Sequence, residues 1–92
     1  MTMDARPLLL ATAYRNRISE PTIEGAFERF REIVGPTVHY QDFCDAVAAC
    51  LAERLIFEPV RLPEGVLQCH WCLELTPAGV ACARRLAGAA VV

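Results

Sequence analysis

The sequence predicts a small α+β domain that is mostly α-helical, on three observations. Apolar residues recur at helical spacing through most of the chain before Leu55. Apolar and polar residues then alternate between Val66 and Leu75, as they do along a strand with one buried face. The chain has 92 residues, of which 54 % are hydrophobic and 22 % charged, and this suits one compact core. We therefore expect residues 1–92 to form a single domain.

The first predicted helix runs from about Ala5 to Arg17. Pro7 is acceptable there, because a proline in the first turn removes no hydrogen bond that the helix would otherwise make. Ile18 follows between polar neighbours and predicts a very short strand. The side chains expected on the inner face of this helix are Leu10, Ala13 and Tyr14.

The second predicted helix, from Pro21 to Val34, has the clearest apolar face. Ser19 or Glu20 is expected to cap its start, and Gly35 with Pro36 to end it. Its expected buried residues are Ile23, Ala26, Phe27, Phe30, Ile33 and Val34.

The third predicted helix begins at Thr37, as its N-cap, and runs to about Arg54. We expect one face to be buried and the other to be presented to solvent or to a partner. The buried residues are expected to be Phe43, Val47, Cys50 and Leu51, and the presented ones Gln41, Asp45, Ala48 and Ala52.

Two strands and a last helix complete the prediction. Leu55–Leu62 is expected to be an edge strand, because Pro59 cannot donate a ladder hydrogen bond. Pro63-Glu64-Gly65 is typical of a turn, and Val66–Leu75 is the second strand of the hairpin. In that strand Trp71 is expected on the core face, and His70 and Cys72 on the outer face. Thr76 then caps a helix that Pro77 opens.

The segment from Phe43 to Ala83 resembles the winged helix-turn-helix superfamily. The residues that carry the resemblance are Leu51-Ala52-Glu53-Arg54-Leu55-Ile56 and Leu75-Thr76-Pro77-Ala78-Gly79, which are similar to stretches in MarR-like and PadR-like regulators. The resemblance implies a three-helix core with a C-terminal β-hairpin wing and an additional terminal helix. It also implies binding of DNA or, where the recognition helix and the wing have lost their cations, binding of protein.

Charge favours the protein-binding interpretation. The chain has 9 basic residues, all arginine, against 11 acidic ones, so its net charge is -2. Glu20, Glu24, Glu28 and Glu32 recur every fourth residue, which places them on one ridge of the second helix. We expect a non-enzymatic regulatory or adaptor module that binds a protein partner through an acidic surface. Its expected contact residues are Glu24, Glu28, Gln41, Asp45 and Ala48.

The alternative is a DNA-binding transcriptional regulator that acts as a homodimer. The start of the third helix offers side chains that can contact base edges, and Arg61 near the wing can contact phosphate. Leu8, Leu9 and Leu10 with the apolar tail Ala87–Val92 would form the dimer seam. The DNA-contacting residues expected in this alternative are Thr37, His39, Tyr40, Gln41 and Arg61.

The residues give no basis for catalysis, a metal or a cofactor. Ser19 is the sole serine, and neither His39 nor His70 has a nucleophile and an acid arranged around it. Cys69 and Cys72 lie three apart on a predicted strand, so their thiols point to opposite faces. The five cysteines form no disulfide framework, and most are expected to be buried apolar filler. No apolar run is long enough for a membrane helix, so we expect a cytoplasmic protein without membrane association.

Overall fold

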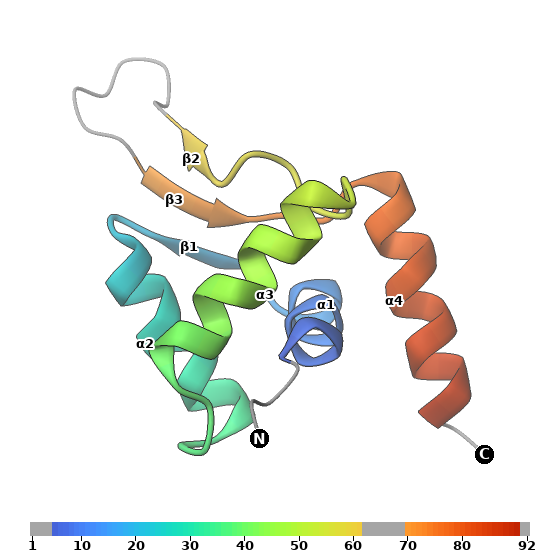
Figure 1. Cartoon of the computed structure of the whole chain (residues 1–92), viewed down its shortest axis with the longest axis horizontal. Coiled ribbons are helices and arrows are strands. Elements are labelled where there is room, and N and C mark those ends of the chain that lie inside the picture. Colours follow the sequence, from blue (N-terminus) through green and yellow to red (C-terminus); the bar gives the residue numbers. More distant parts are fainter. Residues whose placement is uncertain (1–4, 62–69, 91–92) are drawn as a thin grey trace.

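The fold was obtained as a computed structural model, which describes residues 5–61 and 70–90, with side chains to Leu86. These residues form four helices and a three-stranded antiparallel sheet, so the predicted class, α+β and mostly helical, is confirmed (Figure 1). In chain order the elements are α1 (Arg6–Arg15), β1 (Ile18–Glu20), α2 (Ile23–Val34), α3 (Tyr40–Ala52), β2 (Val60–Arg61), β3 (His70–Leu73) and α4 (Pro77–Ala90).

The sheet has the strand order β1-β3-β2. Ile18 lies opposite Leu73, and Val60 lies opposite Trp71. The very short strand predicted at Ile18 is therefore confirmed, and β2 is an edge strand as Pro59 predicts. The predicted turn at residues 63–65 lies outside the described residues.

The strand predicted over Leu55–Leu62 begins later than expected. Within residues 55–61, the part of it that the structure describes, regular pairing covers Val60–Arg61, with an isolated bridge between Ile56 and Leu75. Between these points the pairing is irregular, because Pro59 has no N–H to donate to β3. Its carbonyl instead accepts a hydrogen bond from the Cys72 N–H of β3 at 2.9 Å.

A row of aromatic side chains joins the helices to the sheet. The ring centroids of Phe30 and Phe43 are 5.2 Å apart, and those of Phe43 and Trp71 are 5.6 Å apart. Trp71 is only 4 % exposed, which confirms its predicted place in the core. His70 and Cys72 alternate with the buried Trp71 and Leu73 and face the other side of the sheet, as predicted.

The inner face of α1 differs from the prediction. Leu10 is buried as predicted, but Leu9 and Thr12 are buried as well, whereas Tyr14 is 41 % exposed. The reason is that α1 packs against α2, α3 and α4 at once, so its buried side is set by several neighbours and not by one apolar stripe. Leu9 and Leu10 consequently lie in the chain's own core, and the dimer seam predicted from them is wrong for these two residues.

Two predicted helix caps are also wrong. Thr22, and not Ser19 or Glu20, caps α2 by accepting a hydrogen bond from the Gly25 N–H at 3.1 Å, because Ser19 and Glu20 are paired with β3. His39, and not Thr37, precedes α3, and its N–H donates to the Asp42 carboxylate at 3.1 Å. Val38, between Thr37 and His39, is buried in the core, and α3 begins after it, at Tyr40.

The segment Leu75–Gly79 fastens α4 to the end of α3. The Thr76 hydroxyl donates to the Arg54 carbonyl at 2.7 Å and accepts from the Gly79 N–H at 3.1 Å, which confirms Thr76 as the predicted cap. The Thr76 N–H donates to the Leu55 carbonyl at 3.0 Å. Gly79 touches that carbonyl so closely that a Cβ atom would overlap it. The glycine is therefore required by the close approach of two backbones.

Candidate functional site

The outer ridge of α2 carries acidic side chains without partners. Glu24, Glu28 and Glu32 are exposed, whereas Glu20 is half-buried at the end of β1. Glu32 is paired with Arg29 at 3.2 Å. Within the described part of the chain, Glu24 and Glu28 make no ion pair or hydrogen bond. No described residue of the chain therefore neutralises these two carboxylates.

The presented face of α3 has the residues that the sequence predicted. Gln41, Asp45 and Ala48 are all exposed. The Gln41 side-chain amide donates to Asp45 Oδ1 at 2.8 Å, one helical turn along. This bond uses one N–H of the Gln41 amide and one oxygen of Asp45, so the Gln41 carbonyl oxygen, its second N–H and Asp45 Oδ2 remain for other partners.

Tyr40 connects the two helices into one surface. Its ring packs edge-on against Phe27 of α2, with centroids 5.4 Å apart at 85°, and it remains 40 % exposed. A hydrogen bond with Cys44 raises the pKa of Tyr40, and desolvation and the negative charge of Glu24 raise it further. The ring contact with Phe27 brings the start of α3 against α2. We call the combined patch the acidic surface: Glu24, Glu28, Tyr40, Gln41, Asp45 and Ala48.

The sequence prediction assigned Tyr40 only to the DNA-binding alternative and did not consider Cys44 for either role. The spacing of Tyr40 and Cys44 could have indicated that they are in contact, because residues four apart lie next to each other on a helix. The contact between Tyr40 and Phe27, by contrast, depends on how α2 and α3 pack.

The structure does not bring the five predicted DNA-contacting residues together. Thr37, His39, Tyr40 and Gln41 are exposed near the start of α3. Arg61 lies on β2, at the sheet edge opposite β1, and its guanidinium is paired with Glu74 at 2.8 Å. The expected phosphate contact is therefore neutralised within the chain and separated from the expected base contacts.

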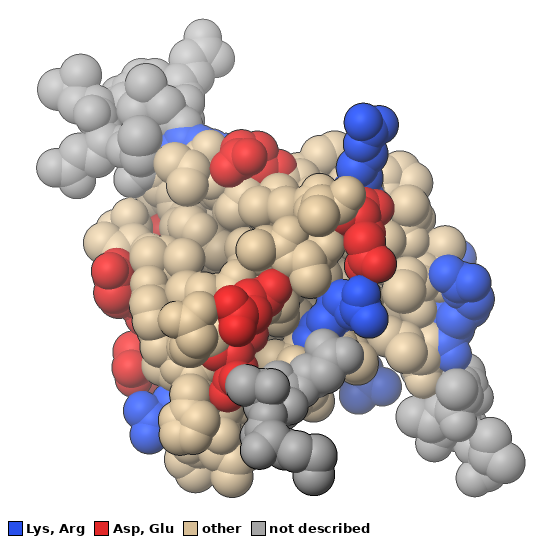
Figure 2. All heavy atoms as spheres, in the orientation of Figure 1, with Lys and Arg blue, Asp and Glu red and all other residues tan. Residues whose placement is uncertain are grey.

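Acidic and basic side chains are concentrated on different parts of the surface. Figure 2 shows acidic side chains over α2 and the middle of α3, whereas most of the visible basic side chains lie toward α4. A specific DNA-binding protein commonly neutralises about 6–10 phosphates with cations around its recognition helix. Arg29 and Arg31 are also exposed on α2, and Arg29 is paired with Glu32, so few free cations near the acidic surface could bind a polyanion.

The cysteines are less buried than predicted. Cys50 is fully buried, but Cys44, Cys72 and Cys82 are partly exposed, so apolar filler does not describe them all. Cys72 lies 3.3 Å from the Ser19 hydroxyl on the outer face of the sheet. Cys69 of the predicted Cys69-x-x-Cys72 pair lies outside the described residues. Among those that are described, no three His, Cys, Asp or Glu side chains converge as metal ligands.

Comparison of the chain with models of protein families, with curated proteins and with solved structures finds no match in any of the three. Across residues 5–61 and 70–90, the helices are too short or too polar to cross a membrane.

Proposed function

We propose that this chain is a non-enzymatic winged-helix module, which acts as a regulator or adaptor by binding a basic protein partner through the acidic surface. The order of elements supports the winged-helix part of the proposal. A helix, a short strand, two helices, an antiparallel strand pair and a last helix follow one another, with the sheet order β1-β3-β2. In such an arrangement α3 takes the position of the recognition helix.

The observation that carries the protein-binding part is the continuity of the acidic surface. Glu24 and Glu28 are unpaired within the described residues, and Tyr40 joins them to the acceptor groups of Gln41 and Asp45. A half-exposed tyrosine that is held against another ring contributes a large contact area at low cost in conformational entropy. Surrounding carboxylates would steer a partner that carries lysine or arginine.

The order of elements also favours the second candidate function, a homodimeric DNA-binding regulator. In that case Thr37, His39, Tyr40 and Gln41 would enter the major groove at the start of α3. Arg61 would have to exchange Glu74 for a phosphate. The acidic surface would then face the DNA, which makes this candidate the less favourable of the two.

Charge reversal on α2 tests the proposal. The double variant E24R/E28R should lose the proteins that the wild-type chain captures from a lysate of its own cells. The matched control is E58R, compared with the single variants E24R and E28R, because each of these changes the net charge equally and Glu58 is exposed outside the acidic surface. Equal capture by the wild type and E24R/E28R would remove the acidic surface from the proposal.

A gel shift separates the two candidates. The protein-binding proposal expects no retardation of genomic DNA fragments even at low salt, where electrostatic binding is strongest. Specific and salt-sensitive retardation, weakened by Q41A, would favour the DNA-binding regulator instead.

A further inference from the structure

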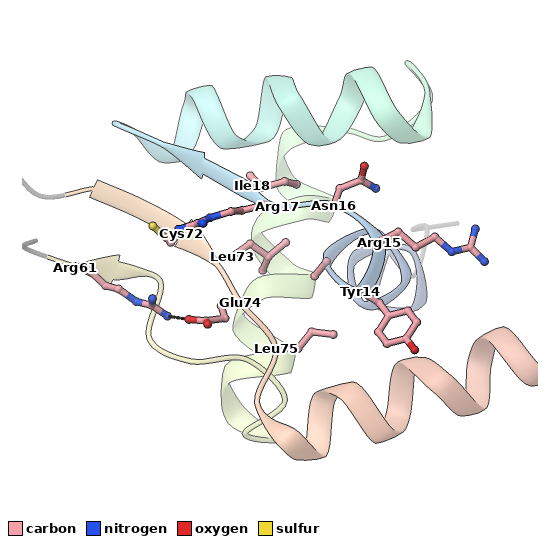
Figure 3. A pocket seen from close by; sticks show the side chains of 11 residues that line it. Tyr14, Arg15, Asn16, Arg17, Ile18, Arg61, Cys72, Leu73, Glu74 and Leu75 are labelled. Atoms are coloured by element: carbon pink, nitrogen blue, oxygen red, sulfur yellow. Dashed lines mark ion pairs between the residues drawn. The ribbon is translucent and has the colours of Figure 1, made fainter.

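A second surface feature lies on the outer face of the sheet, away from the core. It is a hollow of about 480 Å³ between the end of α1 and the strands β2 and β3 (Figure 3). Its volume is within the range of small-molecule sites, about 300–1,000 Å³. The polar side chains that line it are Tyr14, Arg15, Asn16, Arg17, Arg61, Cys72 and Glu74.

The hollow holds an excess of positive charge. Three of the lining side chains are arginines, and Glu74 is the one carboxylate among the lining residues that the structure describes. Glu74 is paired with Arg61 at 2.8 Å. Arg15 and Arg17 make no ion pair or hydrogen bond with any residue in the described ranges. Among the residues that the structure describes, neither guanidinium is neutralised, although the net charge of the chain is -2.

The arginines approach the hollow from different elements. Figure 3 shows Arg17 extended across β3 toward Cys72 and Arg61, whereas the Arg15 side chain points away from these strands. Arg84 of α4 donates its Nε–H to the Tyr14 hydroxyl at 3.2 Å, which leaves the hydroxyl proton of Tyr14 for another acceptor. Arg61 is held by Glu74 and by the Glu58 carbonyl, which accepts from its Nε–H at 3.2 Å. The donors that line the hollow thus come from the end of α1, from Arg17 just after it, and from β2.

Guanidinium groups suit oxyanions with several oxygens. Their planar fork donates two parallel hydrogen bonds to one phosphate or carboxylate, and charge-assisted bonds of this kind are stronger than neutral ones. The site is local, however, because the rest of the chain is acidic and would repel a long polyanion. A small anion can accept these hydrogen bonds without contacting the acidic rest of the chain. A nucleic acid backbone can accept them too, but the rest of the chain would repel it.

We propose that this hollow binds a small phosphate-bearing compound, with Arg17 as the principal anion ligand and Arg61 on the same side of the hollow. The proposal goes beyond the protein-binding function, because it concerns a different face of the domain. A ligand here would contact Arg17, which directly precedes β1, and Cys72 of β3. It would therefore stabilise the pairing of the two strands by binding only the folded chain.

Calorimetric titration of the full chain with pyrophosphate at low salt tests the proposal. We expect one site per chain, and about tenfold weaker binding by R17Q, because a charge-assisted hydrogen bond of this kind contributes enough free energy for a factor of ten. R31Q is the matched control, since Arg31 is an exposed arginine on α2 outside the hollow. Arg17 has an exposed side chain without a partner in the described residues, so R17Q should fold normally. Absence of binding by the wild type, or equal weakening by R17Q and R31Q, would overturn the proposal.

Alkylation of Cys72 gives a second readout. Cys72 lines the hollow and is partly exposed, so bound pyrophosphate should slow its reaction with iodoacetamide, measured by site-resolved mass spectrometry. The rate at Cys44, on the acidic surface side, should not change. A short DNA duplex that protects Cys72 more strongly than pyrophosphate would overturn the small-ligand proposal in favour of nucleic acid. The variant E24R/E28R should retain pyrophosphate binding, so failure of the proposed protein-binding function is distinguishable from failure of this one.

Discussion

Replacement of Gly79 by alanine should destabilise the fold strongly, although alanine is the better helix former. Gly79 lies in the first turn of α4, where a Cβ atom would overlap the Leu55 carbonyl oxygen. To relieve the overlap, α4 must move away from the end of α3. That movement breaks the bonds from the Thr76 N–H to the Leu55 carbonyl and from the Thr76 hydroxyl to the Arg54 carbonyl.

The magnitude follows from these contacts. The two lost hydrogen bonds contribute about 1 kcal/mol each. The displaced backbone costs about 2 kcal/mol, as other overpacked sites do. Alanine returns about 1 kcal/mol of helix propensity. The expected net loss is about 3 kcal/mol, a large fraction of the roughly 5–14 kcal/mol typical of a chain of this length.

Urea denaturation followed by far-ultraviolet circular dichroism measures this loss. The control is G25A in α2, where the added Cβ would lie 3.3 Å from the Thr22 hydroxyl and touch no backbone carbonyl. There the tight contact and the gain in helix propensity roughly cancel, so G25A should differ from the wild type by less than about 0.5 kcal/mol. If G79A is as stable as G25A, the close approach of α4 to the Leu55 carbonyl does not require a glycine at position 79.

Two further predictions concern the end and the start of α3. Arg54 has φ of 58°, so R54G should raise the free energy of unfolding by about 0.5 kcal/mol in urea titrations, while R54A, which keeps the strained backbone, should not. The raised pKa of Tyr40 means that the folded chain holds the phenol proton more tightly than the unfolded chain does. Its contribution to stability is therefore complete below pH 10 and is lost as the pH rises through the pKa of the folded state. The unfolding free energy should fall more steeply above pH 10 in the wild type than in Y40F, and parallel curves would contradict this.

The candidate site was only partly predictable. Exposure of Glu24, Gln41 and Asp45 followed from the helical periodicity alone, and it is confirmed. The link through Tyr40 was missed, because it depends on the packing of α2 against α3. The arginine-lined hollow was missed for a similar reason. Arg17 and Arg61 are far apart in the sequence and approach one face only because both β1 and β2 pair with β3.

The sequence by itself determined the kind and approximate extent of each helix, the burial of Trp71 and the outward position of Cys72. These properties depend on the periodicity of apolar residues over a few turns or a few strand residues, which is a local property of the chain. Only the tertiary structure decided which side of α1 is buried, which residues cap α2 and α3, and why residue 79 is glycine. Each of these depends on contacts between segments distant in the chain, and local periodicity carries no information about how such segments are docked.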